Sequence, residues 1–277
     1  MGGVFLSFIK NNGGIHAFSL SSPFLAFSFS RPCIKIVCMN PIYKRIILKV
    51  SGEALADKTD GTILDKEKLN LVAQNVKMIR SFGVDVGIVV GAGNIWRGRL
   101  SEKIGIELST ADYMGMLGTI INALAIQSAI EENGLPCRVM SSISVNQVCE
   151  PYYRRRAISH LNHGEVVIFA GGTGNPYFTT DSCAALRALE VNADAILMAK
   201  NGVDAVYDSD PRKNPNAKKI PELKLTELIE RKLGVMDLTA AAMLQGKNVE
   251  LRVFSMEDPD AFKKVLFGEA VGTIIKG

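Results

Sequence analysis

A buried-strand pattern runs directly into a loop rich in glycine and threonine in the stretch Val166-Val167-Ile168-Phe169-Ala170-Gly171-Gly172-Thr173-Gly174-Asn175-Pro176-Tyr177-Phe178-Thr179-Thr180-Asp181. The apolar run predicts a strand, and residues 182–191 beyond the loop predict a helix. Glycines let the backbone approach a ligand closely. Hydroxyls and free N–H groups at a helix start suit an anion such as phosphate. An ordinary turn of turn-forming residues is the alternative.

The same order of strand and helix recurs along the chain from Pro41 onward. We expect strands at residues 45–50, 84–90, from 139, at 166–170, 195–198 and 250–254, and a final edge strand at 273–275. We expect helices at residues 69–79, 114–130, 152–161 and 182–191. Near-continuous apolar strands separated by helices are typical of a parallel sheet that is covered on both faces. The predicted fold class is therefore α/β, a three-layer sandwich with a mainly parallel central sheet.

Polar, glycine-rich loops follow three of these strands, at residues 51–53, 91–98 and 171–181. Ligands in open parallel sheets bind outside the carboxyl ends of the strands. We therefore expect the three loops to form one site, although each loop by itself is a weak signal.

Two cations belong to this expected site. Lys49 stands at the end of the first strand, beside Ser51 and Gly52, where a point charge can neutralise phosphate oxygens. The alternative is a lysine that only snorkels from an edge strand. Arg97 in the second loop can grip a phosphate in a fork. Neither loop is a P-loop, and the second is no dinucleotide fingerprint, because Trp96 stands where the third glycine would be.

A further polar segment, residues 200–211, follows the strand predicted at 195–198. Tyr207 offers a ring that can lie against a base, and the neighbouring carboxylates can bond ribose hydroxyls. The alternative is a solvated acidic turn that ends at Asp210. The basic run at 154–156 is more typical of a solvated or subunit-facing helix surface than of a nucleic-acid site.

Composition narrows the class of protein. The chain has 277 residues, 47% of them hydrophobic and 22% charged, which is ordinary for a globular protein. The net charge of +4 does not by itself imply a nucleic-acid partner. Five cysteines without CxxC spacing favour reduced thiols in a reducing compartment. The three histidines form no metal-ligand pattern, so we expect no structural metal site.

The first 38 residues differ from the rest of the chain. They are rich in Phe and Ser and contain three basic residues and no acidic one. Since no apolar run there reaches the length of a membrane span, we expect no transmembrane helix. The segment is a transit peptide, a poor secretory signal, or an upstream extension outside the working protein; we favour the last, with Met39 as the true start. Residues 39–277 are then a single catalytic domain.

The motifs together carry a family resemblance. They are Lys49-Val50-Ser51-Gly52-Glu53-Ala54-Leu55, Gly91-Ala92-Gly93-Asn94-Ile95-Trp96-Arg97-Gly98, Asp112-Tyr113-Met114-Gly115-Met116, Gly172-Thr173-Gly174-Asn175-Pro176-Tyr177-Phe178-Thr179-Thr180-Asp181 and Val203-Asp204-Ala205-Val206-Tyr207. In this order they closely resemble bacterial-type uridylate (UMP) kinases of the amino-acid kinase superfamily, from about Tyr43 to Ile275. The third and fourth motifs are specific to the UMP kinase branch.

The resemblance implies transfer of the γ-phosphoryl group of ATP to UMP, with Mg²⁺ accompanying ATP. It implies that Lys49, Arg97 and Asp181 are catalytic: the two cations would offset charge on the transferred group, and Asp181 would orient the lysine and the magnesium. The ATP-binding residues it implies are Lys49, Val50, Ser51, Gly52, Gly93, Arg97, Asn201, Tyr207 and Asp210. The UMP-binding residues it implies are Ala92, Asp112 on the ribose, Thr173, Gly174, Asn175, Pro176, Tyr177, Phe178, Thr179 and Thr180.

The family also implies a homohexamer that GTP activates and UTP inhibits. From the sequence itself we expect no membrane partner and no required nucleic acid. We expect a cytoplasmic enzyme, or a plastid one if residues 1–38 are a transit peptide. The middle glycine of the family's second loop is Ala92 here, which would disturb the approach of UMP if that position needs a positive φ.

Two rival functions differ in the residues they need. Kinases of carboxylates or carbamates would need a basic clamp in place of Asp112 and the threonine-rich loop. A regulatory module without catalysis would lack Lys49, Arg97 or Asp181, and all three are present.

Overall fold

The computed structural model describes residues 40–277, except 58, 60, 201–203, 210, 212, 213, 215, 257 and 259. The expectations for residues 1–38, and those for Asn201 and Asp210, lie outside the described residues. The description that follows concerns the described part of the unit formed by residues 39–277.

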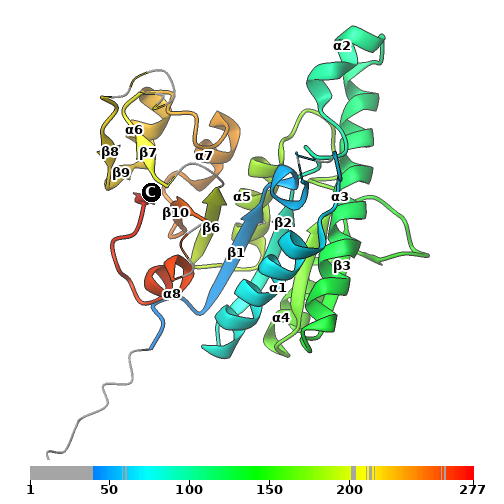
Figure 1. The fold of residues 1–277 in the computed structure, drawn as a ribbon, viewed down its shortest axis with the longest axis horizontal. Coiled ribbons are helices and arrows are strands. Elements are labelled where there is room, and N and C mark those ends of the chain that lie inside the picture. The colour runs from blue at the N-terminus through cyan, green and yellow to red at the C-terminus, as the bar shows by residue number, and fades with distance from the viewer. Residues whose placement is uncertain are drawn as a thin grey trace, which may run out of the picture. The chain divides into compact units, whose positions relative to one another are not determined.

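A mainly parallel sheet of nine described strands forms the centre of this unit (Figure 1). From edge to edge the strands are β4 (Glu150–Pro151), β3 (Cys137–Ser141), β5 (Val166–Ala170), β2 (Asp85–Val90), β1 (Arg45–Val50), β6 (Ala195–Lys200), β10 (Glu250–Ser255), β11 (Thr273–Lys276) and β9 (Glu222–Lys224). Neighbouring strands are parallel, apart from β10 and β11, which pair antiparallel. The strands β7 (Val206–Tyr207) and β8 (Lys219–Ile220) form a separate antiparallel pair.

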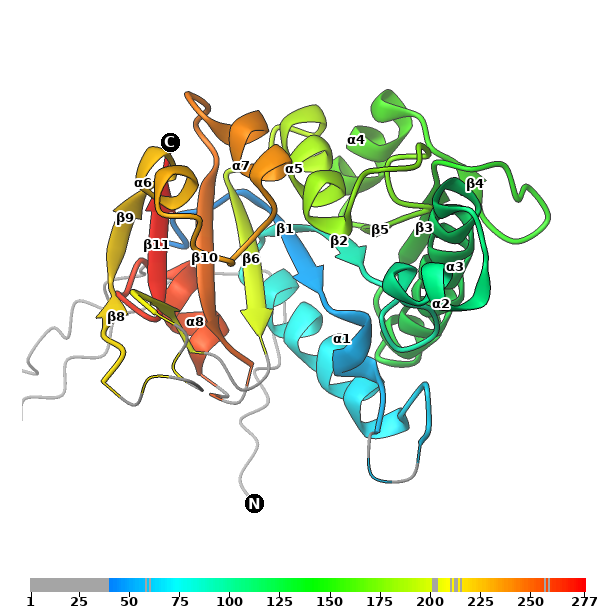
Figure 2. The same ribbon diagram turned by 90° about the horizontal axis from the view of Figure 1, so that it is seen from above.

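Helices cover both faces of the sheet (Figure 2). The first face carries α1 (Lys66–Ser81), α3 (Leu108–Glu132) and α8 (Ala261–Leu266). The second face carries α4 (Arg154–Asn162), α5 (Thr180–Glu190), α6 (Leu225–Glu230) and α7 (Leu238–Leu244). The short elements η1 (Gly52–Leu55), η2 (Gly98–Leu100) and α2 (Ser101–Ile104) lie in the loops after β1 and β2. Each face buries its own apolar cluster, so the predicted three-layer α/β architecture is confirmed.

Strand alternation decides which side chains of β1 reach which layer. Ile46, Leu48 and Val50 are buried in the cluster under α1 and α3. Ile47 is buried in the cluster under α5, so Lys49, two residues further on, is presented to the α5 layer as well. The side chain of Val50, expected at the ATP site, is therefore buried in the core.

Most expected elements are present with ends shifted by a few residues, but the expectation for the last strand is wrong. β11 lies inside the sheet, between β10 and β9. The three-residue strand β9, which the sequence reading missed, pairs parallel with β11 and forms the edge. Such a short strand carries too little of an alternating pattern to be read from the sequence.

Among the described residues, α3 alone is long and apolar enough to cross a membrane by length and composition. Its residues Ile120, Ala123, Ile126 and Ile130 are buried in the core under the sheet. A place in the protein core therefore accounts for the buried part of that composition.

Candidate active site

The three polar loops follow β1, β2 and β5, which are neighbours in the sheet and run parallel. The pairing aligns Lys49 of β1 with Val89 of β2, and Val89 with Phe169 of β5. Because the carboxyl ends of parallel neighbours lie along one edge, the loops at 51–53, 91–98 and 171–181 meet there.

A partly buried ion pair stands at this meeting point. Lys49 Nζ lies 3.0 Å from Asp181 Oδ1, and both side chains are less than one-fifth exposed. Asp181 belongs to the first turn of α5, where the positive end of the helix dipole favours a carboxylate. The hydroxyl of the N-cap residue Thr179 accepts hydrogen bonds from the N–H groups of Asp181 and Ser182. The lysine is therefore an oriented charge rather than a side chain that reaches for solvent.

The loops after β1 and β2 touch each other at Gly52. A Cβ at this position would lie 2.5 Å from Asn94 Oδ1, 2.6 Å from Gly91 O and 2.8 Å from Gly93 N. The backbone of Gly52 is not in the left-handed region, so the glycine is required by space alone. The backbone also joins the two loops, since Gly91 N donates to Val50 O at 3.0 Å.

Ala92 does not have the positive φ that would have made its methyl group a strain. The residue is buried, and its methyl group faces Gly118 of α3, where an added Cβ would come within 2.9 Å of it. The departure from the family's glycine is therefore accommodated on the helix side of the loop.

Arg97 is held by the loop after β1. Its Nη2 lies 2.6 Å from Glu53 Oε1, and its Nε donates to Gly93 O at 3.2 Å. Both partners of the ion pair are more than one-third exposed, so the pair is weak and a phosphate can compete for the guanidinium. Glu53 belongs to the motif at residues 49–55, but the sequence indicates no role for it.

The threonine-rich loop is held from α3. Asp112 Oδ2 accepts a hydrogen bond of 2.7 Å from the backbone N–H of Tyr177, which has φ 71° and is 71% exposed. Thr173 Oγ1 donates to Asn175 O at 3.2 Å within the loop. Thr180 Oγ1 lies near Gly91, where an added Cβ would come within 3.6 Å of it. The residues expected to bind UMP thus extend from Asp112 on α3 to Thr180 beside the glycine loop.

Asp237 is a polar residue of this site that the sequence did not predict. Asp237 caps α7 by accepting from Ala240 N at 2.8 Å. Its carboxylate also accepts hydrogen bonds from the hydroxyls of Thr179 and Ser182, and so ties α7 to the start of α5. An aspartate before a helical run is a cap signal, but only the tertiary structure brings this cap to Thr179.

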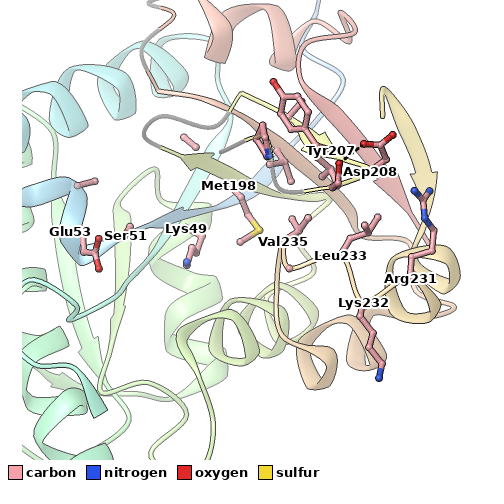
Figure 3. A pocket seen from close by; sticks show the side chains of 18 of the residues that line it. Lys49, Ser51, Glu53, Met198, Tyr207, Asp208, Arg231, Lys232, Leu233 and Val235 are labelled. Carbon is pink, nitrogen blue, oxygen red and sulfur yellow. Dashed lines mark hydrogen bonds between the residues drawn. The ribbon is translucent and has the colours of Figure 1, made fainter. Parts of the chain in front are cut away.

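A cavity of about 1220 Å³ opens beside Lys49 (Figure 3). Lys49 of β1 and Met198 of β6, which are register partners, line it next to Ser51. Its far wall consists of Tyr207, Asp208, Pro211 and the segment 231–235 between α6 and α7. The cavity is large enough for a nucleotide.

Tyr207 is expected to bind ATP together with Asn201 and Asp210, and it is the one of the three that the structure describes. Its hydroxyl donates to Asp204 Oδ1 at 2.7 Å, and this bond raises the pKa of Tyr207 above its usual value. Asp204 also pairs with Lys219, which lowers the pKa of that carboxyl group despite some burial. The basic residues Arg231 and Lys232 line the same wall (Figure 3). The sequence reading missed both, because they stand more than 20 positions from Tyr207 along the chain.

The arrangement is suited to phosphoryl transfer. Backbone donors of the glycine loops and the cation Lys49 converge on one edge of the sheet. The nucleotide-sized cavity opens on one side of them and the threonine-rich loop lies on the other. Transfer between two phosphates needs positioning and charge neutralisation more than a strong base.

Comparisons with known proteins agree with this geometry. Residues 44–255 match the amino acid kinase family, so the chain belongs to that family. The structure resembles a UMP kinase from Bacillus anthracis with a TM-score of 0.82 and 42% identity, over 84% of this chain and 96% of that one. A UMP kinase from Ureaplasma parvum gives 0.80 and 40%, over 84% and 99%. A uridylate kinase from Archaeoglobus fulgidus gives 0.64 and 29%, over 83% and 99%.

The contact at Gly52 yields a prediction. Gly52→Ala should lower phosphoryl-transfer activity by about 100-fold, since the new methyl group must push the glycine loop out of place. Steady-state kinetics and a thermal melt would measure activity and folding together. Gly134→Ala, at the far end of α3, meets nothing within 4 Å but strains a backbone with φ 82°, so it is the control for a generally destabilised chain. Full activity in a folded Gly52→Ala protein would contradict the steric role.

Proposed function

We propose that this protein catalyses phosphoryl transfer from ATP to UMP, giving ADP and UDP, a step of pyrimidine nucleotide synthesis. The observation that carries the proposal is the Lys49–Asp181 pair between the glycine loops and the threonine-rich loop. The similarity to two UMP kinases at 42% and 40% identity supports UMP as the acceptor.

The reaction joins two anions. A phosphate oxygen of UMP attacks the γ-phosphorus of ATP, and the bond from that phosphorus to the β–γ bridging oxygen breaks. The attacking oxygen carries no proton when UMP is a dianion, so no general base is required. Lys49 would offset the charge on the transferred group, and the backbone N–H groups of Gly52 and Gly93 would hold its oxygens.

The two substrates would occupy the two sides of this centre. ATP would bind in the cavity with its base near Tyr207 and its phosphates directed to Lys49. UMP would bind between Asp112 and the loop 173–180. Asp112 now accepts the N–H of Tyr177, so a ribose hydroxyl would share or replace that bond.

The site also suits Mg²⁺ carried by ATP. Apart from the ion pair with Lys49, the buried Oδ1 of Asp181 has no hydrogen-bond donor among the described residues. No group of three ligating side chains stands ready for a metal in the described part of the chain. Magnesium usually takes one or two carboxylates together with substrate phosphates, so Asp181 is its candidate protein ligand. When bound, the ion would neutralise charge on the phosphates.

We propose further that α3 mediates self-association within a homohexamer. Its outward side chains Tyr113, Leu117 and Ile121 recur every four residues as an apolar stripe and are 44–49% exposed. A contiguous exposed apolar face is typical of an interface. We also propose that GTP and UTP regulate the enzyme. We propose a cytoplasmic location, or a plastid one if residues 1–38 are a transit peptide.

The first test is an ADP-release assay of residues 39–277 with ATP and Mg²⁺. UMP, CMP, dUMP, carbamate, aspartate and acetylglutamate would be offered as acceptors. We expect turnover with UMP, because the loop 173–180 and Asp112 suit a nucleotide. Turnover with a carboxylate or carbamate alone would assign another branch of the family. If every acceptor fails, the assay is repeated with residues 1–38 restored, and silence there would refute the proposal.

Lys49→Ala should lower kcat by about 100-fold while the affinity for UMP changes less than about threefold, because the lysine faces the transferred group. Initial rates and equilibrium UMP binding would separate the two effects. Lys77→Ala, which removes an exposed lysine bonded to Asn133 O, is the matched control. Equal losses in turnover and affinity would argue against a transition-state role.

The apolar stripe gives a prediction about assembly. Leu117→Asp should convert the native oligomer to a smaller species, because a charge would be buried at the interface. Light scattering after size exclusion would report the mass. Leu71→Asp, at an equally exposed leucine of α1, should leave the mass unchanged. The interface is placed wrongly if Leu117→Asp keeps the native mass, or if the unaltered protein is already a monomer.

A further inference from the structure

Two polar side chains are buried on the inner face of α3, among apolar core residues. Thr119 is 4% exposed and Asn122 is not exposed at all. They stand one helical turn apart and so share a face of the helix. Burial of a polar side chain costs free energy unless it is hydrogen-bonded. The hydrogen-bond partners of Thr119 and Asn122 therefore indicate the role of the two side chains.

Asn122 holds the loop that follows β2. Its Nδ2 donates to Gly91 O at 2.7 Å. Its side-chain amide also pairs with that of Asn94, at 2.8 and 3.0 Å. Asn94 Nδ2 donates in turn to Ile63 O at 2.7 Å. One buried amide thus fixes the glycine loop at both its first residue and its fourth.

Thr119 holds the other loop, the one that follows β5. Its Oγ1 accepts a hydrogen bond of 2.9 Å from Gly171 N. The same hydroxyl donates to Met116 O at 2.6 Å, which fixes its orientation. Gly171 has φ 71° and is the residue where the chain leaves the strand for the threonine-rich loop. This hydrogen bond therefore lies at the first residue of the threonine-rich loop.

A glycine on α3 keeps the helix close enough for these bonds. A Cβ at Gly118 would come within 2.9 Å of the methyl group of Ala92. The helix therefore lies directly on the glycine loop, with Thr119 and Asn122 as its polar contacts to the two loops.

Each of the two side chains bonds to the backbone of a different active-site loop: Asn122 to the loop after β2, and Thr119 to the loop after β5. We propose that Asn122 and Thr119 are positioning residues. Asn122 fixes the glycine loop at residues 91–98, and Thr119 fixes the threonine-rich loop at residues 171–181. Helix α3 sets the distance between the two loops. The kinetic part of this inference rests on the proposed function.

The two roles predict different kinetic effects. Asn122→Ala should lower kcat at least about tenfold and leave the KM for UMP within about threefold, since it loosens the loop at the transferred phosphate. Thr119→Val keeps the shape but removes the hydroxyl, and should raise the KM for UMP about tenfold with a smaller change in kcat. Thr119→Ser restores the hydroxyl and should restore the KM.

The control on the same helix is Asn133→Ala. Asn133 caps the far end of α3, and its side chain bonds Asn70 and Ala129 O, away from the site. If Asn122→Ala does not fold, Asn122→Leu, which nearly keeps the shape but removes the bonds to Gly91 O and Asn94, takes its place. Effects no larger than those of Asn133→Ala would overturn the proposal, as would equal changes of one parameter in both variants.

A readout without substrate separates this inference from the proposed function. Hydrogen exchange followed by mass spectrometry should show faster exchange at residues 91–98 in the Asn122 variant, with 171–180 unchanged. The Thr119→Val variant should show the reverse. This pattern would uphold the positioning roles even if the unaltered protein does not phosphorylate UMP. Exchange that rises equally in both loops, or in neither, would refute them.

Discussion

Parallel pairing of β5, β2 and β1 is the constraint on which the rest of this structure depends. Because these strands are apolar on both faces, they are stable at the centre of the sheet, where helices cover both sides. Parallel direction then brings three loops, the first and last more than 100 residues apart along the chain, to one edge. Lys49, at the end of β1, is turned toward the α5 layer by strand alternation. The Lys49–Asp181 pair is thus a consequence of the sheet.

The site is organised around backbone groups, and close contacts hold them in place. Gly52 lets the first two loops touch, and Gly118 lets α3 lie on the second loop. Such contacts suit transfer between two phosphates, where donors must be in position before charge builds up. Residues outside the expected catalytic set therefore help to organise the site: Glu53 holds Arg97, and Asp237 ties α7 to the start of α5.

α3 has two faces with different roles. The inner face contacts both active-site loops through Asp112, Thr119 and Asn122. The outer face exposes an apolar stripe that includes Leu117. A second copy bound to the stripe would contact the helix that sets the spacing of the loops. Oligomer assembly and loop geometry would then be physically linked, because a helix moves largely as a rigid element.

The sequence by itself determined the central strands, the helices between them and the residue types of the site. Apolar periodicity gave the central strands, and the motifs around Lys49, Arg97 and residues 171–181 gave the loops, because both signals are local. Only the tertiary structure decided that β9 is the edge strand, that Asp237 meets Thr179, and that Thr119 and Asn122 hold the loops. Each of these depends on a contact between residues far apart in sequence, and no local pattern encodes the distance between two packed elements.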